Sequence, residues 1–296
     1  MNIKKTILVT GALGQDGKIL SKILIKNRYK VIGLVNKFTK YRIKKVIYHK
    51  INLKSYNALK KIILKEKPSH FVHFGSKNPS FKQNYDFYKE NLISTKNIIK
   101  VITETDKNII FIFPNTSQIF IKKKLVNEND KFRISNSYTK FRINVYKYLI
   151  NLKKIEKFKF CNLIIFNHDS KFRDKRFLLP RLVKHVNTGN TKLLNEIYKE
   201  NIIGDFSHAD EICKAIYIII KKKLCLDRLI LSSGKKVKIN DIIDYLIEKY
   251  SNLKKIKIFT KKNNNFIIGN NNKAKKILNW RIKKNIYNAV DDMMNL

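Results

Sequence analysis

Three glycines spaced three residues apart, Gly11, Gly14 and Gly17, interrupt an apolar run close to the start of the chain. Glycines at such positions have separate uses where a backbone turns around a diphosphate. The first permits the tight turn, the second lets the backbone approach the anion, and the third allows the next helix to pack closely. The amide groups at the start of that helix would face the negative charge. Such a pattern also occurs in ordinary loops, so the flanking elements decide its meaning.

Those flanking elements have the character of a buried strand and an amphipathic helix. Residues 6–10 (TILVT) are β-branched and apolar, which is typical of a buried parallel strand. After the glycines, apolar side chains recur at helical spacing, namely Ile19, Leu20, Ile23 and Leu24. Because the glycines lie directly between a strand and a helix, we predict a dinucleotide-binding turn.

The rest of the first half alternates between the two kinds of element. Further strands are predicted at residues 30–35, 45–48, 69–74 and 108–113, the last closed by Pro114, and helices at residues 56–64 and 91–103. This alternation predicts an α/β fold with a parallel, doubly wound sheet and right-handed crossovers. One short biased segment, residues 261–265 (KKNNN), predicts a loop.

Composition narrows the class of protein. With 296 residues, of which 44% are hydrophobic, the chain can bury one large core, or a core and a smaller lobe. The net charge of +42 would suit a nucleic-acid-binding protein, but the lysines are spread through every segment. A nucleic-acid-binding protein should gather its charge in a patch or tail near stacking aromatic residues. We therefore expect no nucleic-acid partner, and a positive field that attracts small dianions.

The cysteines and the apolar segments indicate the compartment. Cys161, Cys213 and Cys225 are odd in number, far apart and without CxxC spacing, so we expect neither a disulfide framework nor a metal site. The first residues have too short an apolar run for a signal peptide, and no later stretch has membrane-spanning length. These features predict a cytoplasmic protein with no membrane partner.

The end of the second predicted strand bears on the choice of dinucleotide. An acidic residue there would bind a ribose 2′-hydroxyl, and a basic residue would accommodate a 2′-phosphate. The chain has Asn36 and Lys37 at this point, with no acid. This favours NADP over NAD, which stays as the alternative, although Lys37 also fits an ordinary exposed lysine.

Five short segments resemble the GDP-mannose 4,6-dehydratases, which belong to the extended short-chain dehydrogenase/reductases (the NAD-dependent epimerase/dehydratase family). They follow the family's order across nearly the whole chain. The resemblance implies a Rossmann-type doubly wound parallel sheet with a smaller C-terminal substrate lobe. It places an NADP-binding domain at residues 1–168 and a mainly substrate-binding lobe at residues 169–296, with about 205–232 returning to the Rossmann domain. The segments are Gln15-Asp16-Gly17, 166–170 (FNHDS, FNHES in the family), 205–209 (DFSHA, DWGHA), 232–234 (SSG, ATG) and 269–280 (GNNNKAKKILNW, GDxxKAxxxLGW).

The resemblance also implies which residues contact the cofactor. Asn36 and Lys37 stand in the family's GxxRR pattern, with one cation kept, and Asn52-Leu53 stands where an Asp-Leu pair lies near the adenine. Arg173 falls where a cofactor-contacting arginine is expected. The full implied set is Gly11, Gly14, Gln15, Asp16, Gly17, Asn36, Lys37, Asn52, Leu53, His168 and Arg173.

Chemistry in this superfamily uses a tyrosine as acid and base on a sugar hydroxyl, a cation that stabilises its phenolate, and a Ser/Thr hydroxyl. The YxxxK motif occurs repeatedly here by chance, as at Tyr56, because lysine is abundant. Counting back from the FNHDS segment with the family's spacing leads to Tyr138 and Arg142, on a helix running to about Leu152. The two side chains would lie one helical turn apart. Arginine thus replaces the family's lysine and cannot readily lose a proton.

Upstream, residues 115–118 (NTSQ) resemble the family's STSE. The resemblance implies that Thr116 hydrogen-bonds the sugar, that Ser117 and Asn167 contact substrate, and that Gln118 stands in place of the glutamate base. An amide cannot accept the proton, and loss of a general base typically costs about 10²–10⁴ in rate. Gly204 likewise replaces the arginine of RDWGH, and KKNNN replaces an RPxE segment.

Three functions remain open. The first is a GDP-mannose 4,6-dehydratase-like lyase that uses bound NADP and acts on the nucleotide-sugar GDP-mannose, with Thr116, Gln118, Tyr138 and Arg142 as the catalytic set. The second is a nucleotide-sugar 4-reductase or epimerase, which needs no glutamate. The third is a catalytically impaired, nucleotide-binding relative that acts as an assembly partner. We also expect a homo-oligomer.

Overall fold

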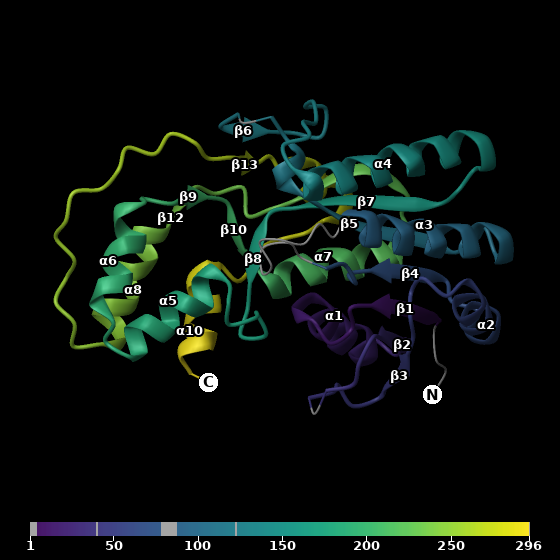
Figure 1. The fold of residues 1–296 in the computed structure, drawn as a ribbon, viewed down its shortest axis with the longest axis horizontal. Coiled ribbons are helices and arrows are strands. Elements are labelled where there is room, and N and C mark those ends of the chain that lie inside the picture. The colour runs from purple at the N-terminus through teal and green to yellow at the C-terminus, as the bar shows by residue number, and fades with distance from the viewer. Residues whose placement is uncertain (1–4, 40, 78–87, 122, 296) are drawn as a thin grey trace. The chain divides into compact units, whose positions relative to one another are not determined.

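The computed structural model describes residues 5–39, 41–77, 88–121 and 123–295. A seven-stranded sheet in the order β11-β7-β5-β4-β1-β2-β3 is its largest element (Figure 1). The pairs β1–β2, β2–β3, β1–β4 and β4–β5 are parallel. The strands are β1 Thr6–Thr10, β2 Lys30–Val35, β3 Val46–Lys50, β4 His70–His73, β5 Ile110–Thr116, β7 Phe160–Ile165 and β11 Leu226–Leu231.

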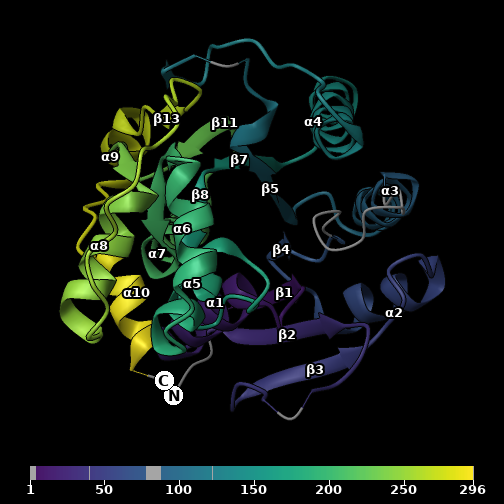
Figure 2. The same cartoon turned by 60° about the vertical axis from the view of Figure 1, so that its left-hand side comes forward.

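Helices cover both faces of this sheet, which confirms the predicted doubly wound α/β fold. Helices α2, α3 and α4 follow one another along one face (Figures 1 and 2). On the other face, α1 contacts α7, where the Tyr217 hydroxyl donates to Asn27 Oδ1 at 2.8 Å. The helices on the two faces are α1 Gln15–Lys26, α2 Tyr56–Glu66, α3 Tyr88–Thr105, α4 Ser137–Glu156 and α7 Ala209–Lys222.

The buried strands match the apolar runs of the sequence. Ile7, Leu8 and Val9 in β1 are completely buried, and the predicted strands at residues 6–10 and 30–35 coincide with β1 and β2. The aromatic rings of Phe111 in β5 and Phe71 in β4 lie 6.2 Å apart in the same core. The limits of these two strands could be predicted because their apolar runs end in turn residues, whereas β3, β4 and β5 begin or end one to three residues away from the predicted limits.

The prediction that Pro114 closes the fifth strand is wrong, because β5 continues through it to Thr116. The Ile110 amide donates to Ser69 and the Phe111 amide to Lys159, so even-numbered residues of β5 face β4. The last β4–β5 pair is Val72 with Ile112. Pro114 therefore lies two residues beyond the last residue of β5 that pairs with β4. In the described part of the chain, no hydrogen bond of the sheet needs a backbone N–H at this position.

The chain divides into two compact units. Unit 1 contains residues 1–119, 131–164 and 213–229, and unit 2 contains residues 120–130, 165–212 and 230–296. These limits describe compactness, so the division of cofactor and substrate binding at residue 168 stays a prediction. None of the helices in the described part of the chain has the length and apolar character needed to cross a bilayer.

Unit 2 consists of helices and three short strand pairs, and it has an apolar core of its own. The core side chains include Leu182, Ile243, Leu246 and Val290. Residues 251–267 contain no helix or strand, which confirms the predicted loop at residues 261–265. The elements are η2 Ser117–Ile119, which precedes unit 2, then β6 Leu125–Val126, β8 Asn167–Asp169, α5 Leu178–Asn187, α6 Thr191–Lys199, β9 Ile203–Gly204, β10 Phe206–His208, β12 Val237–Lys238, α8 Ile239–Tyr250, β13 Ile268–Gly269, α9 Asn272–Leu278 and α10 Ile286–Met294.

Candidate functional site

The glycine turn joins β1 to α1 and leaves almost no room for side chains at two of its glycines. Gly11 has φ +64°, and a Cβ atom there would lie 2.9 Å from the Gly75 backbone nitrogen. At Gly17 a Cβ atom would lie 2.3 Å from the Gly11 carbonyl oxygen and 2.6 Å from the Ala12 Cα. Both positions therefore require glycine, one for the turn and one for the close approach of the helix.

The middle glycine differs because its free side faces space. Apart from its two chain neighbours, a Cβ atom at Gly14 would meet only the Gly11 carbonyl oxygen among the described residues, at 3.2 Å. Gly14 is also the N-cap of α1, and no side chain caps the helix. A helix start without a side-chain cap, next to the space that Gly14 leaves, suits the diphosphate of a dinucleotide. The side-chain amide of the adjacent Gln15 donates to the Asp16 carboxylate at 3.1 Å.

The residues predicted to contact the adenosine end follow neighbouring parallel strands. Asn36 and Lys37 are exposed directly after β2. After β3, the Asn52 side-chain oxygen accepts the Lys54 amide at 3.0 Å, while the Leu53 carbonyl accepts from Asn97 at 2.9 Å. Ligands of open α/β sheets bind beyond the carboxyl ends of the strands, and these residues lie there with the glycine turn.

The structure brings Tyr138 and Arg142 together. Helix α4 begins with a capping box, in which Asn136 and Thr139 bond to each other's backbone amides, and this sets its first turn. One Arg142 amino group donates to the Tyr138 hydroxyl at 3.2 Å, and the guanidinium carbon lies 5.0 Å from the tyrosine ring centroid. Lys140 is exposed and lies 5.3 Å from the Tyr88 ring centroid, so it does not take the cation's place.

Arg142 is a buried cation, with only 7% of its surface exposed. Its guanidinium donates to the Pro114 carbonyl oxygen and, at 3.0 Å, to the Ser76 hydroxyl. The rings of Phe113 and Phe141 lie 5.2 and 5.1 Å from the guanidinium carbon. Among the described residues no carboxylate pairs with it. The Arg142 guanidinium is therefore held by neutral hydrogen-bond acceptors and aromatic rings. Its positive charge can stabilise negative charge on the Tyr138 oxygen.

A buried histidine fixes the backbone that carries Ser76. His73, at the end of β4, hydrogen-bonds Thr10 of β1 at 2.8 Å and Thr95 of α3 at 3.0 Å. The Thr10 hydroxyl in turn accepts the Gly75 amide at 2.9 Å. Burial, together with the nearby guanidinium, lowers the pKa of His73 to about 3. The imidazole is therefore neutral near pH 7, where it can donate from one nitrogen and accept at the other.

The hydrogen-bonded group of Thr10, His73 and Thr95 was not predicted from the sequence. Thr10 and His73 each end an apolar strand, so only the pairing of β1 with β4 brings them together. The available signal was a polar residue at the carboxyl end of each neighbouring strand, which is where ligands and their supporting groups gather.

Thr116 ends β5, and Ser117 and Gln118 follow in the short helix η2. The buried Asn115 amide donates to Asn162 at 3.0 Å, and its oxygen accepts the Thr116 amide at 2.8 Å. The Thr116 hydroxyl accepts the Gln118 amide at 3.3 Å. Thr116 and Ser117 are half-buried and Gln118 is exposed. The backbone of the predicted substrate-contacting segment is thus fixed, while the Gln118 side chain projects outward.

Unit 2 holds the remaining predicted residues, His168, Arg173 and Asn167. His168 Nδ1 lies 2.8 Å from the Phe166 carbonyl oxygen. Arg173 forms an ion pair with Asp169 at 2.9 Å and stacks on the Phe177 ring at 3.6 Å. Asn167 is exposed on β8. Their roles toward cofactor and substrate stay predictions.

A buried carboxylate in unit 2 joins three of the segments that resemble the family. Asp205 Oδ1 accepts the Ser233 amide at 2.8 Å and the Ser233 hydroxyl at 2.6 Å. Its Oδ2 accepts the amides of Gly234 at 3.0 Å and Gly269 at 3.2 Å. Burial raises the pKa of Asp205 although these four bonds oppose the shift. The motifs DFSHA, SSG and GNNN thus meet at one side chain with a structural role.

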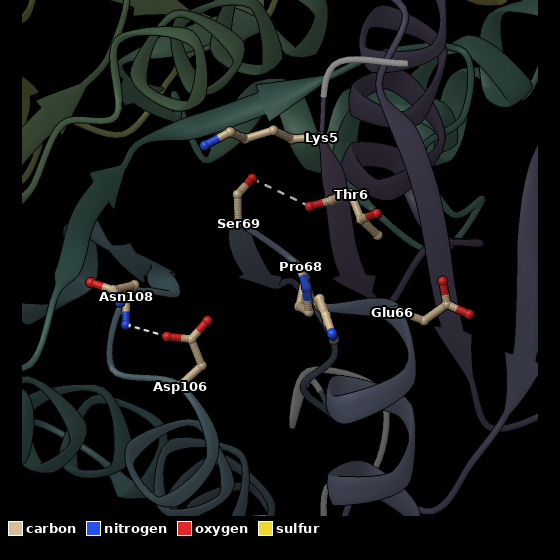
Figure 3. Close-up of a pocket in the computed structure, with 8 residues that line it drawn as sticks. Lys5, Thr6, Glu66, Pro68, Ser69, Asp106 and Asn108 are labelled. Atoms are coloured by element: carbon tan, nitrogen blue, oxygen red, sulfur yellow. Dashed lines mark hydrogen bonds between the residues drawn. The ribbon is translucent and has the colours of Figure 1, made fainter. Parts of the chain in front are cut away.

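A hollow of about 540 Å³ lies elsewhere in unit 1 (Figure 3). Its wall includes Lys5, Thr6, Ser69, Asp106 and Asn108. These residues precede or begin β1, β4 and β5, so the hollow lies at the amino ends of the strands. Dinucleotides and substrates bind at the opposite ends in this kind of sheet, so we assign the hollow no part in the site.

The fold and the glycine turn define an extended short-chain dehydrogenase/reductase. The sequence model of the family described as "GDP-mannose 4,6 dehydratase" matches residues 8–293, and the chain belongs to this family.

Individual relatives agree with this membership. A GDP-mannose 4,6 dehydratase from Dictyostelium discoideum is 24% identical over 351 aligned positions, covering 98% of this chain and 95% of the relative. Among solved structures, dTDP-glucose 4,6-dehydratase from Bacillus anthracis in complex with NAD has a TM-score of 0.82 at 15% identity, covering 99% of this chain and 96% of that one. UDP-glucose 4-epimerase from Thermotoga maritima with UDP-glucose has a TM-score of 0.78 at 15% identity, with coverages of 98% and 97%. The two structural likenesses concern the fold.

Proposed function

We propose that this chain binds NADP and acts on GDP-mannose by transient oxidation at C4, as a nucleotide-sugar 4,6-dehydratase. The observation that carries the proposal is the bond from the buried Arg142 guanidinium to the Tyr138 hydroxyl, at 3.2 Å. A proton acceptor for a sugar hydroxyl needs such a fixed positive charge at its oxygen. Family membership supports the substrate class, and Gly11, Gly14 and Gly17 form a turn that fits a dinucleotide.

In this mechanism the protein orients the sugar and moves its protons. Arg142 stabilises the Tyr138 phenolate, which takes the proton of the C4 hydroxyl and so becomes a neutral phenol. After this transfer the Tyr138 oxygen still accepts the bond from Arg142, so its newly gained proton points away from the guanidinium and toward the sugar, ready to be returned. The Thr116 hydroxyl donates to the sugar. Bound NADP would supply hydride acceptance at C4 and hydride return at C6.

Lys37 supports the choice of NADP over NAD. It is exposed after β2, at the strand end where the ribose 2′-substituent is recognised, and no acid stands beside it to prefer a 2′-hydroxyl. A lysine there can bind a 2′-phosphate with a charged hydrogen bond. The structural relatives crystallised with NAD share the fold at about 15% identity, so they leave this preference as our proposal.

One observation favours a second candidate function. The resemblance of residues 115–118 to STSE implies that Gln118 stands in place of the family's glutamate, and its exposed amide cannot take the C5 proton that water elimination requires. A 4-reductase or epimerase needs only the C4 chemistry of Thr116, Tyr138 and Arg142. This alternative uses the same positioned tyrosine and lacks the elimination step.

The variant Gln118→Glu separates these functions. Glutamate is nearly the same size, and the position is exposed, so the fold should tolerate it. If the chain is a dehydratase with a weakened base, formation of the 4-keto-6-deoxy sugar from GDP-mannose should rise at least about tenfold, or about 1.4 kcal/mol in barrier. Adding Arg142→Lys should raise it further, non-additively if both serve one proton-transfer chain.

Chromatography of the nucleotide-sugars, with NADP supplied, measures the product. A reductase or epimerase would already interconvert a 4-keto sugar and its alcohol, and the glutamate would not help. Tight NADP binding without turnover in any variant would contradict both enzymatic functions. The remaining hypothesis would then be a nucleotide-binding relative that acts as an assembly partner. An unmodified protein that dehydrates GDP-mannose as fast as Gln118→Glu would mean that another group supplies the base.

A further inference from the structure

A second hollow, of about 230 Å³, lies at the sheet edge where α4 ends, β7 begins and β11 begins. Cys225 lines it and is exposed. Three lysines, Lys153, Lys157 and Lys159, also line it, against a single acid, Asp227, which pairs with Lys153 at 2.8 Å. The wall is therefore net positive around an accessible thiol.

A second thiol lies directly beneath this one. Cys161, completely buried in β7, donates from Sγ to the Leu224 carbonyl oxygen at 2.8 Å. That carbonyl belongs to the peptide bond that leads into Cys225. A carbonyl oxygen lies about 2.8 Å from the next Cα in a trans peptide, so Cys161 Sγ lies within about 5.6 Å of the Cys225 Cα.

This separation is close to that of a disulfide. In a formed bridge each sulfur lies roughly 3–4.5 Å from the partner's Cα, given the bond lengths and the usual geometry. Cys225 directly precedes β11, and β11 is the sheet neighbour of β7. A small adjustment at the start of β11 would therefore bring the two sulfurs into bonding distance.

We propose that Cys225 is a thiol–disulfide exchange site for small anionic disulfides, such as oxidised glutathione, and that Cys161 resolves the product into a Cys161–Cys225 bond. The site lies outside the proposed catalytic set and does not depend on the proposed function. The lysine-lined hollow selects an anionic reagent, and the buried thiol beneath it completes the reaction.

The exchange balances in two steps. The Cys225 thiolate attacks one sulfur of oxidised glutathione, the S–S bond breaks, and one glutathione leaves as a thiol, so that a mixed disulfide remains on Cys225. The Cys161 thiolate then attacks the Cys225 sulfur and expels the second glutathione. The protein loses two electrons and two protons, and one disulfide is reduced to two thiols.

Burial slows both steps near neutral pH. It raises the pKa of Cys225, and Lys159 and Lys153 offset part of this shift. Burial also raises the pKa of Cys161. Since the thiolate is the nucleophile, the exchange should accelerate as the pH rises above 7.

The experiment treats the full chain with oxidised glutathione or with cationic cystamine, alkylates free thiols, and maps the cysteines by mass spectrometry. We expect a protein lighter by two hydrogens, with Cys161 and Cys225 linked and Cys213 alkylated only after unfolding. Cys161→Ser, or Cys161→Ala if serine folds poorly, should stop at the mixed disulfide on Cys225. Cys225→Ser should leave the other cysteines unreacted in the folded protein.

The reagents test the charge of the hollow. Oxidised glutathione should react faster than cystamine by about 1.4- to fivefold for each exposed ion pair that it forms with the lysines of the hollow. The variant Lys157→Asn removes one positive charge from the hollow and should reduce the ratio of the two reaction rates. Lys157 is the left-handed C-cap of α4, a conformation that asparagine tolerates. A mixed disulfide that persists on Cys225 in the unmodified protein would overturn the role of Cys161. Faster reaction with cystamine, or first reaction at Cys213, would overturn the exchange site.

Discussion

Replacement of Asp205 by asparagine should destabilise unit 2 strongly, because every partner of the carboxylate is a donor. Oδ1 accepts the Ser233 amide and hydroxyl, and Oδ2 accepts the amides of Gly234 and Gly269. An asparagine has one NH₂ group, which must face two of these donors in either orientation. The less costly orientation points NH₂ at Ser233, where the hydroxyl can turn to accept but the amide cannot.

The magnitude follows from that count. One buried amide left without an acceptor costs about 1–3 kcal/mol, and the remaining bonds lose the strength that the ionised acceptor gave them. Burial of the Asp205 charge is unfavourable, as the raised pKa of Asp205 indicates. Because asparagine carries no charge, it avoids this cost, which offsets part of the loss of stability. We expect a net loss of about 2–4 kcal/mol in the free energy of unfolding.

Two measurements check this prediction. Urea unfolding reports the total loss, and hydrogen exchange reports the amides of Ser233, Gly234 and Gly269 individually. These amides should exchange at least about tenfold faster in the variant, as a loss above about 1.4 kcal/mol requires. Asp174→Asn is the matched control, since Asp174 is in the same unit but is paired at the surface with Arg176. A change in Asp205→Asn no larger than that of the control would refute the reasoning.

Three further predictions concern the proposed site and its support. Lys37→Ala should weaken NADP binding by about 0.2–1 kcal/mol, because the side chain is exposed, and leave NAD binding unchanged in calorimetry; unchanged NADP affinity would remove Lys37 from the site. Tyr138→Phe should lower turnover of the true substrate at least about 10²-fold while NADP binding persists, with Tyr56→Phe as a neutral control; full turnover would contradict our choice of tyrosine. Burial lowers the pKa of His70 to about 4 and that of His73 to about 3, so below pH 6.5 the unfolded chain takes up protons first. Each of the two histidines should therefore reduce stability by about 1.2 kcal/mol between pH 7 and pH 5.5; an unfolding free energy constant over that range would show that the histidines titrate normally.

Much of the sheet could be predicted because its signals are local. The apolar runs of β1 and β2 end in glycine or polar turn residues, and their predicted limits match the structure. Glycines placed directly between a strand and a helix allow a tight turn and close packing, so the turn at Gly11 and Gly17 could also be predicted. The prediction at Pro114 was wrong because a proline ends a strand only where the sheet needs a backbone N–H at that position. Whether it does depends on how far β4 extends beside β5.

The polar groups that support the site could not be predicted in the same way. Asp205 bonds to residues 28 to 64 positions away, and His73 joins a strand 63 positions earlier to a helix 22 positions later. No periodicity in the sequence marks such partners, since each contact depends on the finished fold. Ser76 was missed for the same reason, because only the guanidinium of Arg142 gives it a role.

The return of the chain to unit 1 for its last strand has a consequence for synthesis. All six residues of β7 are buried, and one side of β7 is covered by β11, which begins at Leu226. The ribosome must add about 60 residues after β7 before β11 exists, which takes roughly 3–12 s at about 5–20 residues per second. During that interval an apolar strand stands at the edge of the nascent sheet, ready to pair with another chain. The exposed edge of β7 is therefore a feature of the ribosome-bound chain that the finished sheet no longer has, because β11 covers it.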